Sequence, residues 1–251
     1  MLFYFTATGN CLYAAQQLDE NIISIPRALK EGKLNYEDET IGFVFPDYAG
    51  EMPKIVREFI EKGTFKADYI YSVATYGREY SVVAKWSMEF MKEHGVDCRY
   101  SDVLLMVDNY LPSFDMLEEK AIDKHIPEQI EKLKTNIAAR KEGYAEPSEH
   151  GLAAYDIVSK RDPKFNNGSS IYVTDACVGC GICTIVCPRG NFYLKDRKAA
   201  RHSSTCEFCL ACVHHCSQKA IKLAYLDKNP EERYINPEIR LADIIKANNQ
   251  N

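Results

Sequence analysis

Eight cysteines arranged in two matching runs constrain this chain more than any other feature of its sequence. The first run has the spacing C-x2-C-x2-C-x3-C, is followed by Pro188, and contains Cys177, Cys180, Cys183 and Cys187. The second run repeats that spacing 29 positions later and contains Cys206, Cys209, Cys212 and Cys216. Such a repeat predicts two copies of one structural unit around a pseudo-twofold axis, each helping to complete the other's site.

The cysteine spacing predicts metal ligation. Three thiolates in a tight turn can hold three irons of a four-iron cubane, while a fourth thiolate arrives from elsewhere in the chain. A zinc site is the alternative, but zinc ligands are normally two paired C-x-x-C motifs, which the three-plus-one runs fit poorly. The sequence therefore favours iron-sulfur clusters over zinc.

The region from Ser170 to Tyr225 closely resembles the bacterial two-4Fe-4S ferredoxins, including its CPRG and CSQKAI endings. The resemblance implies a small α+β ferredoxin-like domain in which the fourth cysteine of each run ligates the other cluster. One cluster is then assigned to Cys177, Cys180, Cys183 and Cys216, and the second to Cys206, Cys209, Cys212 and Cys187. For His202, His214 and His215, we expect surface or packing roles, or hydrogen bonds that tune the cluster potential.

The first 142 residues alternate short apolar runs with helical patterns, which is typical of a parallel sheet covered by helices. The expected strands are Leu2–Thr6, Asn21–Ile25, Thr40–Phe45, Tyr69–Ala74 and Cys98–Val107. The expected helices are Asn10–Asp19, Lys54–Glu61, Ser81–His94 and Leu117–Lys141. This part of the chain is therefore predicted to be a doubly wound α/β domain with a five-stranded parallel sheet.

A connection follows this domain, because the chain from Glu142 to Ser170 is rich in Gly, Pro, Ser and Asn. We expect an α/β domain at 1–142, a linker at 143–169, a cluster domain at 170–225 and a C-terminal extension at 226–251. The extension contains a short amphipathic helix, Pro237–Ala247, which needs a partner surface and is expected to pack as a strap on one of the domains.

The first expected strand leads directly into a loop and then into a helix. This loop contains Thr6, Ala7, Thr8, Gly9, Asn10 and Cys11. Free backbone amides at a helix start attract an anion, threonine hydroxyls can donate to it, and Gly9 permits close backbone approach. No lysine follows, so the loop does not match those that bind nucleoside triphosphates. The sequence therefore predicts a site for a phosphate group.

The loop resembles the flavodoxin signature T-x-T-G-x-T/S, which implies binding of the FMN 5′-phosphate and a flavodoxin-like strand order of 2-1-3-4-5. Most of the chain thus resembles flavodoxin-ferredoxin fusion proteins. Cys11 stands where the family has Ser or Thr, so a weak thiol donor replaces a hydroxyl. Without a bound anion, the helix start is expected to lower the pKa of the Cys11 thiol.

The same resemblance places the flavin ring against the loops after the third and fourth strands. These loops contribute Pro46, Tyr48, Ala49 and Gly50, and Thr75, Tyr76 and Gly77. Tyr48 is expected to stack on the ring, while amides near Thr75 form hydrogen bonds at its polar edge. Ordinary turn formation is the alternative for each loop. Asn109 and Tyr110, after the fifth strand, are further candidates.

Charge and hydropathy bear on the class of partner and on the location. The net charge of −5 and pI near 5.8 give no reason to expect the basic face that nucleic-acid binding requires. The N-terminus lacks the basic region and long apolar stretch of a signal peptide, and no run approaches 18 apolar residues. We expect a cytoplasmic protein without membrane insertion.

Two clusters and FMN would make a converter between one-electron and two-electron carriers. The first hypothesis is an electron carrier that docks on redox proteins, either ferredoxin-type donors or flavoprotein acceptors. The second is an FMN-dependent reductase of a small substrate, with Tyr76, Tyr80 or Tyr110 as proton donor, so the sequence leaves enzymatic activity open. The third is a redox sensor or scaffold whose clusters are structural.

Overall fold

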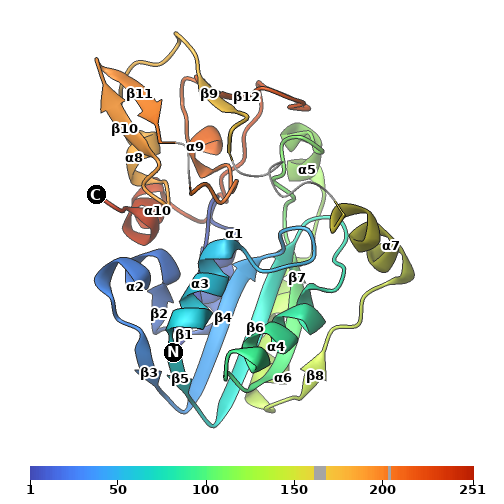
Figure 1. Cartoon of the computed structure of the whole chain (residues 1–251). Coiled ribbons are helices and arrows are strands. Elements are labelled where there is room, and N and C mark those ends of the chain that lie inside the picture. The colour runs from blue at the N-terminus through green and yellow to red at the C-terminus, as the bar shows by residue number, and fades with distance from the viewer. Residues whose placement is uncertain (161–167, 203–204) are drawn as a thin grey trace. The chain divides into compact units, whose positions relative to one another are not determined.

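The computed structural model describes residues 1–160, 168–202 and 205–251, which form two compact units (Figure 1). Unit 1 contains Met1–Phe5, Asn10–Met106 and the described residues of Lys124–Arg161. Unit 2 contains Thr6–Gly9, Val107–Asp123 and the described residues of Asp162–Asn251. This division differs from the expected domain bounds, since two segments from the first 142 residues group with the C-terminal part.

Unit 1 is built on a parallel sheet of six strands in the order β2-β1-β4-β6-β7-β8. They are β1 (Leu2–Tyr4), β2 (Ile22–Ser24), β4 (Thr40–Pro46), β6 (Tyr69–Tyr76), β7 (Cys98–Leu105) and β8 (Gly143–Tyr144). The five expected strands lie in the order second, first, third, fourth, fifth. The predicted number was wrong, because the two-residue β8 adds a sixth strand beside β7. A short parallel pair, β3 (Asn35–Glu37) and β5 (Thr64–Lys66), forms a separate two-stranded sheet.

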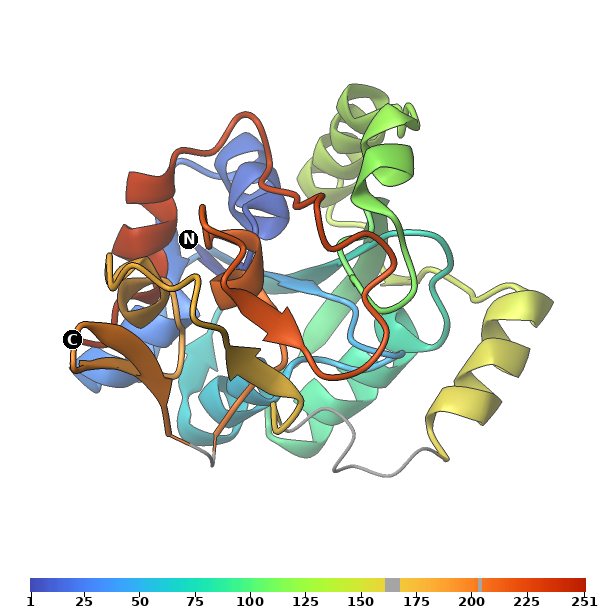
Figure 2. The same cartoon turned by 90° about the horizontal axis from the view of Figure 1, so that it is seen from above.

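Helices cover both faces of the six-stranded sheet (Figure 2). They are α1 (Asn10–Leu18), α2 (Ile25–Glu31), α3 (Lys54–Lys62), α4 (Val83–Glu93) and α6 (Ile126–Ala138). Helix α7 (Glu149–Val158) also belongs to unit 1 and packs against the loop after β4. Helix α1 packs against α6, and α2 packs against α3. This double cover explains why β1 is buried along its whole length and reads as a continuous apolar run. Among the described residues, no helix has both the length and the apolar character needed to cross a membrane.

The helix predicted from Leu117 to Lys141 is two helices. Helix α5 (Met116–Ala121) ends at Ile122, whose backbone is extended, and α6 begins after His125, which has a φ of 49°. Pro127 lies in the first turn of α6, where its missing amide hydrogen is no loss. The same proline could not continue a helix from α5, because its ring clashes with the preceding turn.

The predicted linker at 143–169 is partly regular, which corrects the expectation of a simple connection. It contributes β8 and α7, and the hydroxyl of Ser148 caps α7 by accepting a hydrogen bond of 3.0 Å from the Gly151 amide. The rest of the expected linker includes residues 161–167, which lie outside the described part of the chain. Composition alone could not reveal this capped helix.

In unit 2, the repeated elements follow the repeated cysteines. Helices α8 (Ile182–Ile185) and α9 (Ala211–His214) are 29 positions apart and contact each other. Strand β9 (Ile171–Val173) pairs with β12 (Ile221–Leu223), and β10 (Phe192–Lys195) pairs with β11 (Lys198–Arg201), both antiparallel. Each pair joins a strand of the first copy to one of the second, as expected for two copies that complete each other.

Unit 2 ends in α10 (Leu241–Asn248), which is shorter at its start than the predicted Pro237–Ala247. Residues 237–240 lie outside the helix, while Ile244 and Asn248 are fully buried. The core of this unit combines apolar side chains from the cysteine repeat with Leu111, Met116 and Tyr234. The extension is therefore packed into unit 2.

Candidate iron-sulfur and flavin sites

The two cysteine runs adopt left-handed backbone conformations at three pairs of equivalent positions. The pairs are Gly179 (φ 70°) and Phe208 (52°), Gly181 (80°) and Leu210 (59°), and Gly190 (60°) and Lys219 (48°). A left-handed residue turns the chain sharply and can direct successive amides to one side. The second run keeps this shape without glycine, at a strain of about 1 kcal/mol or more for each residue.

One group of four cysteines takes its members from both runs. Burial raises the pKa of the Cys183 thiol to about 12, and neighbouring thiols add to the rise. Those neighbours are Cys177, Cys180 and Cys216. The amides of Ala199 and Ala220 donate to the sulfurs of Cys177 and Cys216, each at 3.3 Å. Such donors stabilise negative charge on a ligating sulfur.

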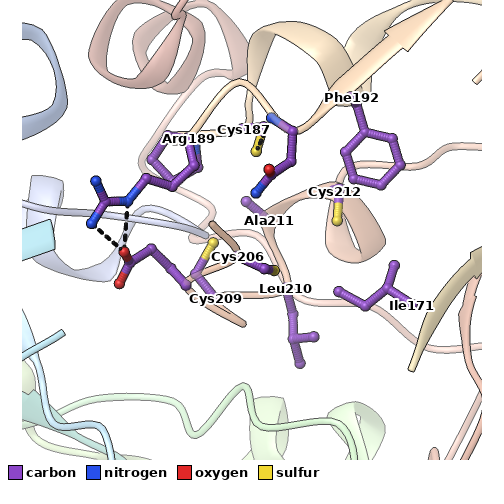
Figure 3. Close-up of a pocket in the computed structure, with 12 residues that line it drawn as sticks. Ile171, Cys187, Arg189, Phe192, Cys206, Cys209, Leu210, Ala211 and Cys212 are labelled. Atoms are coloured by element: carbon purple, nitrogen blue, oxygen red, sulfur yellow. Dashed lines mark hydrogen bonds and ion pairs between the residues drawn. The ribbon is translucent and has the colours of Figure 1, made fainter. Parts of the chain in front are cut away.

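The second group lines one pocket and again joins the two runs. Figure 3 shows this pocket, whose cysteines are Cys187, Cys206, Cys209 and Cys212. Burial raises the pKa of the Cys212 thiol well above its usual value, and the thiols that raise it further are, in order, Cys187, Cys209, Cys206 and Cys183. Because Cys183 belongs to the first group, the two groups are neighbours, as transfer of electrons between two clusters requires.

The surroundings of this pocket suit a bound group with thiolate ligands. Its apolar lining includes Ile171, Phe192 and Leu210. The amides of Asn191 and Phe208 donate to the sulfurs of Cys187 and Cys206, each at 3.3 Å. Buried thiols resist ionisation, so positive irons would be needed to hold them as thiolates. Within the described ranges, no three His, Cys, Asp or Glu side chains are grouped to hold a single metal ion.

An ion pair lies beside the same pocket. The Arg189 guanidinium, labelled in Figure 3, contacts Oε1 of Glu207 at 2.7 Å. The Glu207 side chain is only 2% exposed. A buried carboxylate needs such a partner, because an unpaired charge is strongly destabilising. The pair joins the end of the first cysteine run to the start of the second. It thus holds both ligand-bearing segments around the second group.

Comparison with known proteins identifies the cysteine repeat. Residues 170–225 match the family model of the 4Fe-4S dicluster domain. This part of the chain is a ferredoxin-like 4Fe-4S domain. The chain is also 35% identical over 77 residues to an uncharacterized ferredoxin of Methanocaldococcus jannaschii, covering 27% of this chain and 48% of the relative. The chain therefore spans about half the length of that ferredoxin. No solved structure matches the chain.

The dicluster match supports 4Fe-4S binding over the zinc alternative. It covers both cysteine runs and ends at Tyr225, so it leaves out the N-terminal 169 residues and the C-terminal extension. The expected flavin residues, which lie between Thr6 and Tyr110, are thus outside the matched region.

Besides the ferredoxin-like domain, unit 2 contains the loop Thr6–Gly9 and the segment Val107–Asp123 after β7. The side-chain amide of Asn109 donates to the Thr8 hydroxyl at 2.7 Å, so two predicted flavin contacts lie together. The Tyr110 ring packs edge-on against Phe208 of the second cysteine run, with ring centroids 6.3 Å apart. Tyr110 is therefore part of the packing around the cysteine repeat.

In unit 1, the remaining flavin candidates gather where β4 and β6 end. Pro46 pairs with Thr75 across the sheet, and the Cys11 sulfur lies 3.1 Å from the Thr75 hydroxyl. This arrangement places Cys11, at the start of α1 beside Asn10, next to the two expected loops. The carboxyl edge of the sheet is where ligands bind in open α/β folds.

The loop after β4 has an unusual backbone. Ala49 and Gly50 have φ values of 59° and 89°, and a Cβ on Gly50 would lie 2.4 Å from the Tyr155 ring of α7. The Tyr48 ring lies edge-on to the Phe5 ring, with ring centroids 6.5 Å apart. Helix α7 therefore packs on a predicted flavin loop, which the sequence did not indicate.

The loop after β6 has partners of its own. The Tyr76 and Tyr80 rings pack together with their centroids 4.9 Å apart. The Gly77 carbonyl accepts a hydrogen bond of 3.3 Å from the Lys124 ammonium group. Burial raises the pKa of the Tyr76 hydroxyl. A phenol with a raised pKa is a weaker acid, so this environment does not favour Tyr76 as a proton donor.

The expected acidity of Cys11 is wrong. Its side chain is only 2% exposed, and burial raises the pKa of its thiol to about 12, against which the Thr75 hydrogen bond acts weakly. Desolvation disfavours the thiolate more than the helix start favours it. Cys11 is thus a buried neutral thiol in this structure.

We predict that this burial gives the protein an alkaline pH dependence. An unfolded Cys11 thiol ionises near pH 9.0, whereas the folded thiol stays protonated until about pH 12. The contribution of the protonated thiol to the unfolding free energy is therefore complete below pH 9.0. It is lost as the pH rises from 9.0 to about 12, because the unfolded state then binds fewer protons than the folded state. Urea denaturation between pH 8 and 11 should show a smaller decline in unfolding free energy for Cys11→Ala than for the parent chain.

A surface role, one of those expected for the tandem histidines His214 and His215, is wrong, because both side chains are buried and packed. His214 donates from Nε2 to the Asn109 carbonyl at 3.0 Å and accepts from the Tyr234 amide at Nδ1 at 3.1 Å. His215 donates from Nε2 to the Ala7 carbonyl at 3.1 Å. Burial lowers the pKa of His214 to about 3, so its imidazole is neutral. The proximity of these histidines to the cysteines was the only sequence signal.

Proposed function

We propose that this protein is an electron-transfer iron-sulfur flavoprotein that passes single electrons between two 4Fe-4S clusters and FMN. The observation that carries the proposal is the grouping of eight cysteines into two neighbouring sets of four within a ferredoxin-like domain. The clusters supply one-electron steps, and a flavin, when bound, supplies both one-electron and two-electron steps.

Within this proposal, each cysteine run supplies three ligands to its own cluster and one to the other. Cys177, Cys180, Cys183 and Cys216 hold the first cluster, and Cys206, Cys209, Cys212 and Cys187 hold the second. Crossed ligation is supported by the thiols that raise two pKa values. The second-run thiol that raises the pKa of Cys183 is Cys216, and the first-run thiol that raises the pKa of Cys212 most is Cys187. Crossed ligation also matches the pattern of two-cluster ferredoxins.

FMN is proposed to bind with its phosphate on the loop from Thr6 to Cys11. The flavodoxin-like strand order is consistent with the sheet, although β8 adds a strand that the resemblance did not imply. Further support comes from the amides of Ala7 and Thr8, which are buried and have no hydrogen-bond partner among the described residues. Unpaired amides that face one way form an anion-binding concavity.

Residues in the later loops are proposed to contact the flavin ring. They are Pro46, Tyr48, Ala49, Gly50, Thr75, Tyr76, Gly77, Asn109 and Tyr110. The register between Pro46 and Thr75 supports a shared position at the carboxyl edge of the sheet. The Tyr110 ring also packs edge-on against Phe208 of the cysteine repeat.

We propose the carrier function over catalysis on a separate substrate. The raised pKa of Tyr76 and the packing of Tyr110 on Phe208 leave two of the three candidate proton donors poorly suited to that task. The partners would then be redox proteins, either ferredoxin-type donors or flavoprotein acceptors. A cytoplasmic location is proposed with them, because reduced cysteines persist there.

One preparation tests the proposal. The protein is purified without oxygen, its absorption and EPR spectra are recorded, and iron, sulfide and flavin are assayed. We expect about eight irons and one FMN per chain, with reversible reduction of both kinds of centre. Zinc in place of iron, or no flavin, would overturn the proposal. Turnover of a small substrate at the flavin would favour the reductase, and collapse on reduction would favour a sensor.

A further inference from the structure

Residues from the C-terminal half of the chain hold the phosphate loop by hydrogen bonds to its backbone carbonyl oxygens. The carbonyl oxygens of Thr6–Thr8, taken in order, accept hydrogen bonds from Asn248 Nδ2 at 2.9 Å, His215 Nε2 at 3.1 Å and the backbone nitrogen of Asn236 at 2.8 Å. All of these residues belong to unit 2. Three successive peptide groups of the loop are therefore anchored by residues more than 200 positions away in the chain.

Anchoring the carbonyls also sets the direction of the amides. A trans peptide group is planar, and its N–H points opposite to its C=O. The three hydrogen bonds thus orient the N–H groups of Ala7, Thr8 and Gly9 away from their donors. The Gly9 amide donates to the Thr6 hydroxyl at 3.2 Å. In the described part of the chain, the other two amides make no hydrogen bond, although Ala7 is 7% exposed and Thr8 is 1% exposed.

Two buried amides without partners are costly unless a ligand satisfies them. Consecutive free backbone amides are the donors of anion sites, and a hydrogen bond to each carbonyl polarises the peptide and strengthens its N–H as a donor. The loop is therefore prepared for a phosphate by the groups that hold its opposite side.

Two of the side chains that anchor the loop, those of His215 and Asn248, also connect to the cysteine runs. His215 precedes Cys216 directly, and the Asn248 side-chain amide also donates to the carbonyl of Val186 at 3.3 Å, one residue before Cys187. Each of these two side chains thus connects one cysteine run to the phosphate loop.

The C-terminal extension also fits closely against the loop. A Cβ on Gly9 would lie 2.9 Å from Cβ of Asn236 and 3.0 Å from Cβ of Ile239, and the φ of Gly9 is 109°. Only glycine allows this approach. The extension therefore packs directly against the loop at Gly9.

We propose that Asn248, His215 and the backbone at Asn236 are positioning residues for flavin phosphate binding. The ferredoxin-like domain and the C-terminal extension complete the phosphate site by fixing the loop's carbonyls, so that the affinity for FMN depends on an intact cluster domain. This inference rests on the proposed binding of FMN. The effect belongs to the phosphate, because the anchored peptides are those of the phosphate loop.

The test compares FMN with riboflavin, which has the same ring but no phosphate. Dissociation constants are measured by flavin fluorescence for the cluster-loaded full chain and for Asn248→Leu and His215→Leu. We expect each variant to bind FMN about tenfold more weakly, the usual effect of losing one hydrogen bond, with riboflavin affinity within about twofold of the parent. His215→Gln keeps a donor near the Nε2 position and should restore FMN affinity.

Matched controls make the same histidine-to-leucine and asparagine-to-leucine substitutions at exposed positions. His202→Leu and Asn251→Leu should leave both affinities unchanged, because both side chains are exposed. Iron content shows that each variant is folded, and His215→Gln keeps the test informative if His215→Leu does not fold. An equal loss of FMN and riboflavin affinity, or no loss of either, would overturn the inference. A parent chain that binds neither flavin would instead overturn the proposed function.

Discussion

Replacing Cys187 and Cys209 together is expected to remove only one cluster, although the two residues belong to different cysteine runs. In the crossed arrangement both are ligands of the second cluster, so a chain with Cys187→Ala and Cys209→Ala should keep about four of about eight irons. The pairing of Cys187→Ala with Cys180→Ala removes a ligand from each cluster. That variant should keep almost no iron.

The two double variants separate crossed from uncrossed ligation, because each model predicts the opposite order of iron retention. Iron and sulfide assays with EPR of the reduced protein measure the outcome. Cys98→Ala provides the matched control, since Cys98 is a buried thiol in β7 of unit 1 and should leave all irons in place. Greater iron loss from the Cys187 and Cys209 pair than from the Cys187 and Cys180 pair would contradict the proposed ligand sets.

Gly179→Ala is expected to abolish the first cluster, whereas Gly181→Ala should be tolerated. Both glycines have left-handed backbones, with φ values of 70° and 80°. A Cβ on Gly179 would lie 2.2 Å from the carbonyl oxygen of Arg197, while the nearest atom to a Cβ on Gly181 is a Leu194 methyl at 3.7 Å. The first substitution adds a backbone clash to the strain, and the second adds only strain.

The expected sizes follow from that difference. Left-handed strain in Gly181→Ala amounts to about 1–2 kcal/mol of unfolding free energy, and Leu210 already carries it at the equivalent position of the second run. Gly179→Ala should lose about 3 kcal/mol or more, because the turn after β10 must move. Urea denaturation under anaerobic conditions, combined with iron counts, measures both. Equal effects of the two substitutions would show that the clash with Arg197 does not matter.

Much of the fold could be predicted because its signals are local. Alternating apolar runs and helical periodicity indicated five strands of the parallel sheet, and α1, α3 and α4 lie close to their expected bounds. The prediction failed where local composition was ambiguous. The break between α5 and α6 depends on Pro127, and α7 depends on one capping serine within a stretch whose composition is typical of a linker.

The candidate sites also differ in how far local sequence could predict them. Cysteine spacing is a local pattern, and it was sufficient to predict a 4Fe-4S dicluster domain at 170–225, which the family match supports. The behaviour of Cys11 was predicted wrongly, because its pKa depends on burial rather than on its place at the start of α1. Burial is a property of the packed chain and leaves no mark in a short motif.

The eight-cysteine repeat by itself determined that this protein has a two-cluster module, since the cysteines of each run lie within a few residues of one another. Tertiary structure alone decided that this module and the C-terminal extension hold the loop Thr6–Gly9. Asn248 and His215 reach carbonyls that any residue could present, so their partners cannot be recognised in the sequence. A hydrogen bond to a backbone group depends on where the chain passes and not on which side chain is there.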